Sequence, residues 1–341
     1  MGLTIIVGGQ YGSEGKGKTA LAFSRMKNAA AVVRVGGPNS GHTVIDKDGK
    51  KHVFRMLPSA AVDNGPDAPA LIFPAGSYLD IKILLDEMKE NGIEESRVLI
   101  DPNACIIRKA ERNYEVKGDL RRNIASTLSG TGGSVAARIA RSDIRILARV
   151  HDELENMLCN TKKWMDNAIK AGRNIIVEGT QGYMLSSIHT PCYPYCTSRD
   201  TTAAGFLSEC GLSPFDVDDV VMCLRTYPIR VGGNSGFLPK EISWDKVSKW
   251  NPHMEPVVEY TSVTHTVRRV AEFDHLTVKE AILANKPTHI VLNHLDYISP
   301  DARKEYVYRI QDRVGCEIDY LGLGPENIFY KYDVWNDLHN M

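Results

Sequence analysis

Short apolar runs alternate with helical patterns along the chain. Runs rich in β-branched residues predict buried strands at residues 3–7, 29–35, 70–73, 97–101, 174–178, 219–224 and 289–293. Apolar positions with helical spacing predict helices at residues 18–27, 80–91 and 151–171, the last two closed by Gly92 and Gly172. This alternation predicts an α/β fold with a mainly parallel central sheet flanked by helices. We expect one large domain over residues 1–341.

Composition narrows the class of protein. A chain of 341 residues can bury a large core, and a net charge of -1 gives no electrostatic case for a nucleic acid polymer or a membrane surface as partner. The seven cysteines are an odd number and scattered, so we expect reduced thiols and a cytoplasmic protein. No segment reads as a signal peptide or a membrane span.

A glycine-rich loop follows the first predicted strand. Glycines crowd residues 8–17, Lys16 and Lys18 add positive charge, and a helical pattern follows. Glycine lets backbone N–H groups close on an anion, and a helix N-terminus favours negative charge, so the loop predicts a phosphate site. The alternative is a glycine-rich turn that happens to carry lysines. The loop also satisfies the P-loop pattern G-x-x-x-x-G-K-S/T through Gly12, Gly17, Lys18 and Thr19.

Further small-residue loops follow other predicted elements. The stretch GGPNSGHT occupies residues 36–43, before a polar hairpin with Asp48 and Gly49 at its turn. Residues 123–135 are rich in serine, threonine and glycine and precede a helical pattern carrying Arg138, Arg141 and Arg145. Hydroxyls and glycine amides at a helix start suit a phosphate, although a flexible linker has the same composition. The stretch EGTQG, residues 178–182, puts a carboxylate at a strand end, where α/β folds build sites.

Two later loops leave alternatives open. His189, Cys192 and Cys196 could ligate a metal, but no fourth ligand accompanies them, and two prolines favour a rigid loop. Residues 259–274 are rich in hydroxyls and carry Arg268 and Arg269, which suits either a solvated loop or a clamp for a carboxylate substrate. Residues 322–328, GLGPENI, form a glycine–proline turn.

Taken in order, these motifs resemble one family along nearly the whole chain, the adenylosuccinate synthetases. The matching stretches are GSEGKGK at residues 12–18, GGPNSGHT, the serine–threonine loop, EGTQG, YPYCTS and the threonine- and arginine-rich loop. The resemblance implies an adenylosuccinate synthetase or P-loop-like fold. It also implies an enzyme that uses a nucleoside triphosphate and Mg²⁺ to phosphorylate the 6-oxygen of a purine nucleotide, after which the amino group of aspartate displaces the phosphate.

The resemblance also implies roles for individual residues. Catalysis falls to Ser13, Lys16 and His42, with His42 donating to the γ-phosphate or the 6-oxygen. The nucleotide and phosphate positions are Gly12, Gly15, Lys16, Gly17, Lys18, Thr19, Gly41, His42, Thr43, Asn293, His294, Asp296, Gly324 and Pro325. The purine monophosphate positions are Asn39, Ser126, Thr127, Gln181, Thr197 and Arg141, the last reaching across from the second subunit of a homodimer. Val263, Thr264 and Arg268 match the aspartate site, and Ser13 and the Gly41 carbonyl match the magnesium site.

The first departure from the family pattern is Ser13. The family has a carboxylate there that takes the N1 proton of the purine, whereas a serine hydroxyl is not a useful base near neutral pH without help. This departure is similar to a viral branch of the family, the 2-aminoadenylosuccinate synthetases, which act on dGMP toward 2,6-diaminopurine DNA. A smaller side chain at Ser13 also leaves room for a 2-amino group. The replacement base stays open between a substrate phosphate oxygen, a water relayed through Ser13, and Glu14.

Two further departures concern the ribose and the phosphate donor. Thr266 stands where the family has an arginine near the ribose, which is consistent with a deoxyribose. His294 replaces a lysine of the guanine-reading motif, so we expect ATP or dATP as the donor, unless His294 is an ordinary core or surface histidine. The alternative within the family is an ordinary adenylosuccinate synthetase that uses IMP and GTP. A P-loop NTPase switch, with Asp101 holding the metal, would leave the GHT, EGTQG and aspartate loops without a role.

Overall fold

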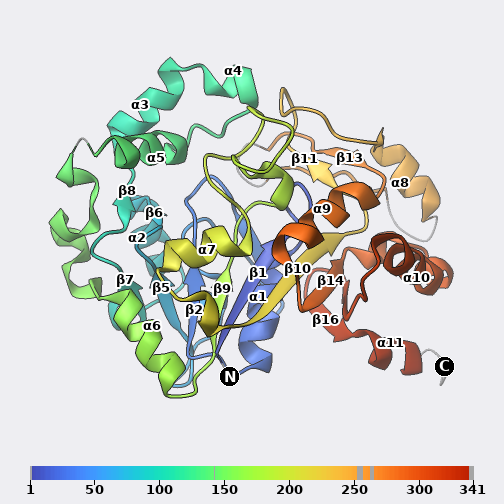
Figure 1. Ribbon diagram of the computed structural model, residues 1–341, viewed down its shortest axis with the longest axis horizontal. Coiled ribbons are helices and arrows are strands. Elements are labelled where there is room, and N and C mark those ends of the chain that lie inside the picture. The colour runs from blue at the N-terminus through green and yellow to red at the C-terminus, as the bar shows by residue number, and fades with distance from the viewer. Residues whose placement is uncertain (1, 142, 252–255, 262–264, 338–341) are drawn as a thin grey trace.

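A computed structural model describes residues 2–141, 143–251, 256–261 and 265–337 (Figure 1). Its centre is a nine-stranded sheet in the order β16-β15-β14-β10-β1-β9-β2-β5-β7. All neighbouring pairs are parallel except β15 and β16, which form an antiparallel edge. The strands of this sheet are β1 Leu3–Gly8, β2 Ala31–Arg34, β5 Ala70–Phe73, β7 Val98–Ile100, β9 Ile175–Glu178, β10 Val217–Arg225, β14 His289–Asn293, β15 Tyr320–Leu323 and β16 Asn327–Tyr330. The predicted α/β class and mainly parallel sheet are confirmed.

Helices and short strands surround this sheet. The helices are α1 Lys16–Met26, α2 Ile81–Glu90, α3 Lys109–Lys117, α4 Leu120–Ile124, α5 Thr131–Ala140, α6 Thr161–Lys170, α7 Ala203–Cys210, α8 Trp244–Trp250, α9 His275–Asn285, α10 Arg303–Val314 and α11 Lys331–Asp337. The short strands are β3 His42–Ile45, β4 Lys51–Phe54, β6 Tyr78–Leu79, β8 Cys105–Ile106, β11 Ile229–Arg230, β12 Glu241–Ile242 and β13 Arg269–Ala271. Within the described ranges, no helix has the length and apolar character needed to cross a bilayer.

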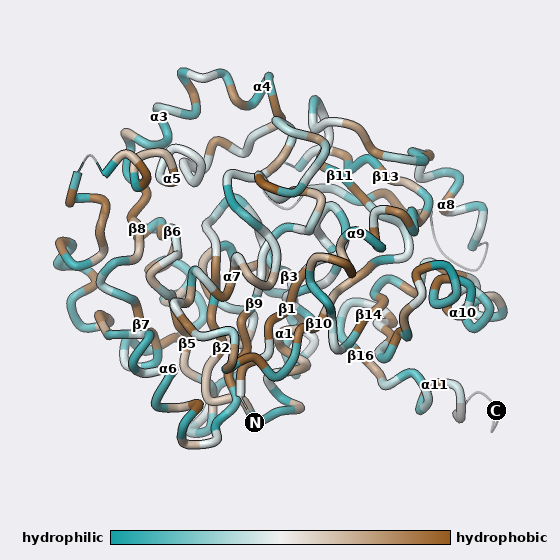
Figure 2. The backbone as a smooth tube through the Cα atoms, in the orientation of Figure 1, coloured by the Kyte–Doolittle hydropathy of each residue, from teal (hydrophilic) through white to brown (hydrophobic). Residues whose placement is uncertain are grey.

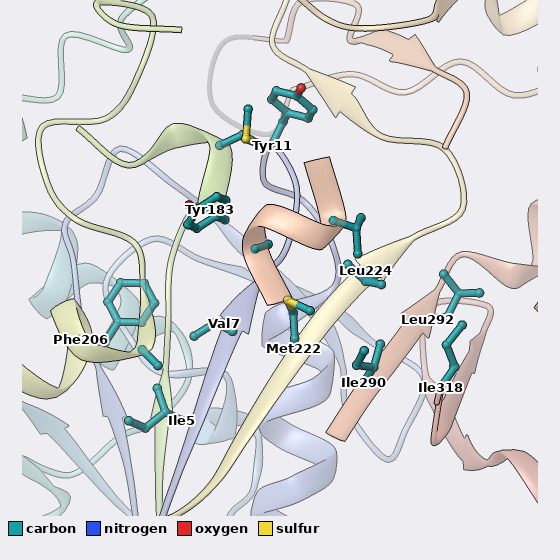
Figure 3. Close-up of a cluster of buried hydrophobic side chains, with 14 of the residues drawn as sticks. Ile5, Val7, Tyr11, Tyr183, Phe206, Met222, Leu224, Ile290, Leu292 and Ile318 are labelled. Atoms are coloured by element: carbon teal, nitrogen blue, oxygen red, sulfur yellow. The ribbon is translucent and has the colours of Figure 1, made fainter. Parts of the chain in front are cut away.

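Both faces of the sheet are buried because side chains alternate along each strand. Ile5 and Val7 of β1 face one cluster, which Phe206 of α7 covers together with residues of α6, α9 and α10 (Figure 3). Ile6 faces the other cluster, under Phe23 of α1 and residues of α2. In Figure 2 the hydrophobic colour accordingly gathers on the central strands, while the peripheral α10 is mostly hydrophilic. Strands buried on both sides explain why the sequence shows continuous apolar runs.

The parallel strands bring their carboxyl ends to one edge of the sheet. β1 ends at Gly8, beside β9 ending at Glu178 and β10 ending at Arg225. Arg34 at the end of β2 is in register with Glu178, and Asn293 at the end of β14 is in register with Arg225. The polar residues that follow the apolar runs therefore share this edge, which is where open α/β sheets bind ligands.

One predicted helix is wrong as a single element. Residues 151–171 divide into a 3-10 helix, Asp152–Met157, and α6. Between them the backbone N–H of Cys159 donates to the carbonyl of Ile100 at 2.9 Å, so the chain attaches to the edge of β7. Asn160 then caps the restarted helix by accepting from the N–H of Lys163 at 3.0 Å. Both pieces bury apolar side chains, but in different clusters: Leu154 and Met157 pack in one cluster, and Met165 and Ala168 pack in the other.

The predicted small-residue loop and arginine-bearing helix also need correction. Residues 123–135 are not one loop, since their two ends belong to α4 and α5. Of the three arginines only Arg138 lies in α5. Arg141 ends the helix in a left-handed conformation, with φ of 53°. Arg145 lies in a separate 3-10 turn, where its N–H is capped by Asp143 at 2.9 Å. The predicted hairpin is confirmed as β3 and β4, and α1 begins two residues earlier than expected.

Candidate active site

The loop between β1 and α1 closes around its own carboxylate. Glu14 is fully buried and accepts from the N–H of Gln10 at 3.2 Å, the N–H of Gly12 at 2.7 Å and the Nζ of Lys16 at 2.5 Å. Three donors on an enclosed carboxylate leave it poorly placed to take a substrate proton in this conformation. For Lys16 to bind a phosphate, its ammonium group would have to leave Glu14.

Ser13 is the exposed side chain at the turn of this loop. Its φ of 57° is left-handed, a conformation in which asparagine and aspartate are enriched among non-glycine residues. Its carbonyl accepts from Nη1 of the fully buried Arg225 at 3.2 Å, which fixes the turn. The hydroxyl is thus presented outward at the strand ends, and an aspartate would fit the same backbone.

A buried ionic group lies where β2, β3 and β9 meet. Glu178 accepts from the N–H and the hydroxyl of Ser59, both at 2.7 Å, and from Arg34 Nη1 at 3.2 Å. Nδ1 of His42 also contacts Glu178, while Arg34 Nη1 lies 2.8 Å from Nε2 of the same ring. Burial, reinforced by Arg34, lowers the pKa of His42 to about 4, so the ring is neutral at pH 7. With Nδ1 on the Glu178 carboxylate, the neutral ring carries its proton on Nδ1 and accepts from Arg34 at Nε2. Donation to a substrate oxygen therefore requires that Arg34 leave and that Nε2 gain a proton.

A second group of polar residues joins β14 to the β15–β16 turn. The side-chain amide of Asn293 donates to the carbonyl of Glu14 at 2.8 Å. This bond links the group to the glycine-rich loop between β1 and α1, which we call the phosphate loop. Asp296 accepts from the N–H of Gly324 at 3.1 Å, and Lys18 Nζ donates to the carbonyl of Gly324 at 2.8 Å. Burial lowers the pKa of Lys18 to about 8. Pro325 beside Gly324 is exposed, so the turn and Asp296 form one accessible rim.

The His294 ring belongs to the same rim. It is half-buried, it packs edge-on against Tyr297 with ring centroids 5.4 Å apart, and its residue has a left-handed φ of 59°. Burial, with Arg225 nearby, lowers the pKa of His294 to about 3, so the ring is neutral at pH 7. A neutral, partly accessible imidazole beside Asp296 offers one donor and one acceptor to a base.

The residues assigned to the purine monophosphate come from four separate segments. Ser40 Oγ and Thr180 Oγ1 lie 2.6 Å apart, which joins the segments that carry Asn39 and Gln181. The N–H of Thr197 donates to the carbonyl of Leu185 at 2.8 Å, which holds Thr197 in place. Arg141 is exposed at the end of α5. The remaining assigned side chains are partly exposed, as a ligand requires: Asn39, Ser126, Thr127, Gln181 and Thr197.

The amides at the start of α5 are not free for a phosphate, contrary to the sequence expectation. The buried carboxylate of Glu115 on α3 accepts from the N–H groups of Gly130, Gly132 and Gly133 at 2.9, 2.7 and 3.2 Å. An internal anion therefore occupies the helix N-terminus. Ser126 and Thr127 lie partly exposed on the preceding loop.

The aspartate assignments are only partly covered, because Val263 and Thr264 lie outside the described residues. Arg268 Nη1 lies 3.2 Å from Oε2 of Glu259, which also pairs with Arg225. Thr266 is exposed, and its N–H donates to the Thr261 hydroxyl at 3.0 Å. These contacts hold the arginine-rich segment against the phosphate loop.

A metal at His189, Cys192 and Cys196 is not supported. Among the described residues no group of three histidine, cysteine, aspartate or glutamate side chains could hold an ion. The His189 ring instead stacks on Tyr183, with centroids 6.2 Å apart. For Mg²⁺ the candidates offer single oxygens: the exposed hydroxyl of Ser13 and the carbonyl of the partly exposed Gly41. That set fits an ion completed by substrate phosphates and water.

Four residues of this edge were not assigned a role from the sequence: Arg34, Glu115, Arg225 and Glu259. Arg34 and Arg225 did carry a signal, since a charged residue ending an apolar strand has to be paired when the strand is buried. Glu115 and Glu259 sit among other charged and polar residues and carry no such signal. Their importance follows from contacts across 15 or more positions of sequence.

The comparisons with known proteins agree with one another. A family model described as adenylosuccinate synthetase matches residues 5–153 and 146–300. The adenylosuccinate synthetase of Methanococcus vannielii is 35% identical over 344 residues, covering 96% of this chain and 97% of that protein. The N6-succino-2-amino-2'-deoxyadenylate synthase of Vibrio phage phiVC8 is 32% identical over 343 residues, covering 94% and 95%.

Two solved structures extend the likeness to the fold. The cyanophage S-2L succinoaminodeoxyadenylate synthetase (PurZ), bound to dGMP and to dATP as an energy donor, has a TM-score of 0.83 at 30% identity, covering 99% of this chain and 98% of that one. The adenylosuccinate synthetase of Plasmodium falciparum has a TM-score of 0.84 at 19% identity, covering 97% and 100%. The second likeness concerns the fold alone.

Proposed function

Because the chain belongs to the adenylosuccinate synthetase family, a family of C–N bond-forming ligases, we propose that it condenses dGMP with L-aspartate at the expense of ATP. The products are N6-succino-2-amino-2'-deoxyadenylate, ADP and phosphate. The observation that carries the proposal is Ser13, an exposed hydroxyl at the turn of the phosphate loop, where the family pattern has a carboxylate. The names of the two phage relatives support the same substrate.

The reaction needs two steps on the purine. The γ-phosphoryl group of ATP passes to the 6-oxygen as the N1 proton leaves, and the aspartate amine then attacks C6 and expels phosphate. Lys16 and the loop amides are proposed to hold the transferring group, which requires Lys16 to leave Glu14. His42 is proposed to donate to the charge that develops on the 6-oxygen, once Arg34 has released its ring. The Gly41 carbonyl and the Ser13 hydroxyl would help substrate phosphates to hold Mg²⁺, which would supply charge neutralisation.

The proposed base that takes the N1 proton is a phosphate oxygen or a water at Ser13. The contacts of Glu14 argue against the third option, since that carboxylate is enclosed and already accepts three hydrogen bonds. Replacing Ser13 with Ala separates the remaining two. The assay is run at saturating Mg²⁺, which offsets the loss of the proposed metal contact at Ser13. A water relayed by the hydroxyl then predicts a large loss of kcat in Ser13→Ala, whereas a phosphate oxygen predicts little change.

ATP or dATP is the proposed phosphate donor. A guanine base needs a carboxylate for its N1 and N2 protons, and Asp296 keeps one oxygen on the N–H of Gly324. His294, neutral at pH 7, offers one donor and one acceptor instead of the fixed positive charge of a lysine. This exchange suits the N6 donor and N1 acceptor of adenine. Arg141, exposed at the end of α5, supports a homodimer in which it reaches the neighbouring purine site.

The test is a comparison of dGMP and IMP in the protein and in Ser13→Asp. We expect the native protein to form a succinylated product from dGMP, detected by mass. The left-handed turn accepts aspartate, so Ser13→Asp is expected to move the ratio of kcat/KM toward IMP by about tenfold or more. Ser13→Asn, which adds the same bulk without charge, is the matched control. An unchanged ratio in Ser13→Asp would remove the argument from this residue.

The second candidate is an ordinary adenylosuccinate synthetase that uses IMP and GTP. Its support is the higher identity, 35%, to the Methanococcus vannielii enzyme. Parallel initial rates with IMP and GTP, and with dGMP and ATP, separate the two candidates in one experiment. Exclusive use of IMP by the native protein would favour the second.

A further inference from the structure

Arg225 is a charged side chain enclosed at the end of a central strand. It has no exposed surface and leads the largest fully buried side chains of the described chain. Gln10 clamps its backbone, accepting from the N–H at 2.9 Å and donating to the carbonyl at 3.1 Å. Its Nη1 donates to the carbonyl of Ser13 at 3.2 Å. The guanidinium thus holds the phosphate loop, and its charge must be compensated nearby.

Glu259 supplies that compensation and gathers donors from three segments. Arg225 donates to it through Nη2 and, at 3.4 Å, through Nη1. The hydroxyl of Tyr297 donates to Oε1 at 3.0 Å, and Arg268 Nη1 donates to Oε2 at 3.2 Å. Burial alone would raise the pKa of Glu259, but the arginines lower it to about 2, so it is ionised throughout the working range. Four donors fill the acceptor sites of one carboxylate.

Arg268 keeps part of its hydrogen-bonding capacity unused. Glu259 engages Nη1 only, while the enclosed Nε has no hydrogen-bond partner among the described residues. A guanidinium binds a carboxylate through two parallel N–H donors, so an arginine anchored at one Nη can present another pair of N–H groups to a second carboxylate. The anchoring fixes the plane in which that second carboxylate must approach.

We propose that Glu259 is a positioning residue that orients Arg268 for the substrate carboxylate and, through Arg225, fixes the turn of the phosphate loop. It acts through the two arginines and does not itself contact substrate. The inference rests on the proposed function, in which Arg268 binds aspartate. One carboxylate thereby ties the amino-acid segment to the loop that holds the transferring phosphate. Free Arg268 would sample many rotamers, and part of the binding free energy would be spent on ordering it.

The next residue in the chain provides a contrast. Arg269 pairs with Glu241 through two hydrogen bonds, at 2.8 and 2.6 Å, and both side chains are partly exposed. An exposed pair contributes little to stability. Glu241 thus has the same charge and the same kind of partner as Glu259 without the link to Arg225 or the phosphate loop, which makes it a matched control.

The experiment compares Glu259→Gln with Glu241→Gln. Steady-state kinetics are measured with aspartate varied at saturating purine nucleotide and with purine nucleotide varied at saturating aspartate. We expect Glu259→Gln to raise the KM for aspartate about tenfold or more, with the KM for the purine nucleotide changed less than about twofold. Glu241→Gln should leave both values as they are. Circular dichroism establishes that each variant is folded.

The split between the two KM values is the deciding readout. A merely structural role of Glu259 would lower the amount of active enzyme or raise both KM values together, and either result overturns the proposal, as does an unchanged KM for aspartate. If Glu259→Gln does not fold, Tyr297→Phe removes one donor from the carboxylate and keeps its charge. That variant should raise the KM for aspartate about two- to threefold with the purine KM unchanged, and no change there would equally overturn the proposal.

The same comparison separates this proposal from the proposed function. The kinetics are run with whichever purine nucleotide the native protein converts, dGMP or IMP. If only IMP is converted, the dGMP assignment fails and the test of Glu259 still stands. If product forms and Glu259→Gln has the same KM for aspartate as the native protein, the positioning role fails and the assigned reaction remains.

Discussion

Removing the Glu115 carboxylate is expected to destabilise the start of α5 severely. Glu115 is 3% exposed and accepts from three backbone N–H groups, those of Gly130, Gly132 and Gly133, at 2.7 to 3.2 Å. Glu115→Ala leaves those donors without a partner at the positive end of the helix dipole. The loop before α5 carries Ser126 and Thr127, so the same change should loosen the purine site.

The magnitude follows from the contacts. A hydrogen bond to a charged group contributes about 1.5 to 3 kcal/mol, which would give a gross loss of several kcal/mol for three. Water can enter the vacated space and accept from some of the three N–H groups, since Gly132 is partly exposed. We therefore expect the free energy of unfolding to fall by about 3 to 5 kcal/mol. Glu115→Gln keeps one carbonyl acceptor and should lose about half as much.

Urea unfolding followed by tryptophan fluorescence measures this loss, with the native protein and Glu115→Gln in parallel. Sulfate supplies the second readout, since an anion can occupy the vacated helix N-terminus. It should stabilise Glu115→Ala more than the native protein, whose site is filled by its own carboxylate. If Glu115→Ala stays within about 1 kcal/mol of the native protein and sulfate stabilises both equally, the three hydrogen bonds do not matter as argued.

The remaining predictions concern titrating groups. Burial lowers the pKa of His42 to about 4, below the ordinary value of about 6.5, so only the unfolded chain gains this proton between those pH values. Stability should therefore fall by about 3 kcal/mol as pH drops from 6.5 to 4, and urea unfolding of His42→Gln should show a flatter profile. Burial lowers the pKa of Lys18 to about 8, so the KM for the triphosphate should rise above that pH, and Lys18→Arg should remove the rise. Burial raises the pKa of Cys105 to about 11 and of Cys223 to about 12, and raises that of Cys210, so Ellman's reagent should reach these three thiols only after unfolding; fast reaction in the native protein would contradict their burial.

The sheet was predictable because burial on both faces leaves a simple trace in the sequence. The runs at β1, β9 and β14 are continuously apolar, and each ends in a polar or glycine-rich motif. Parallel strands put those ends at one edge, so motifs far apart in the chain could be expected to meet. The break between the 3-10 turn and α6 was not predictable, because it depends on Cys159 pairing with the edge of β7.

The internal partners of the site could not be read from the sequence. A carboxylate in a charged helix such as α3 has many possible partners, and nothing local shows that Glu115 turns toward the amides of α5 rather than toward water. The same holds for Glu259, which lies 34 residues from Arg225. Composition indicated a phosphate site at the start of α5, which Glu115 occupies instead. It could not show that the anion is a side chain of the same protein.

Four glutamates share this use of an internal negative charge: Glu14, Glu115 and Glu178 are buried, and Glu259 is partly buried. Glu14 accepts from amides and from Lys16 of the glycine-rich loop, and Glu115 accepts from the amides at the start of α5. Glu178 contacts His42 and Arg34, and Glu259 pairs with Arg225 and Arg268. The cations and amides named here thus each have a carboxylate partner before any substrate arrives, whereas Lys18 donates to backbone carbonyls. Under the proposed function, substrate phosphates and carboxylates would therefore bind by displacing these carboxylates or by using donors that remain free. The free energy of binding then depends on the difference between the hydrogen bond that the cation makes to the substrate anion and the one that it made to the internal carboxylate.

This exchange explains how one sheet edge can hold several anions without unpaired buried cations when it is empty. An unpaired buried lysine or arginine is costly, so a site prepared for a triphosphate, a nucleoside monophosphate and a dicarboxylate would destabilise the fold without internal partners. A phosphate can replace Glu14 as the partner of Lys16 because both groups are anions that accept a hydrogen bond from the ammonium group. Arg225 has no exposed surface, so its partner remains Glu259. Arg225 holds the backbone of Ser13 through its carbonyl rather than through the Ser13 hydroxyl. The side chain at this position can therefore change without disturbing Lys16 or Arg225.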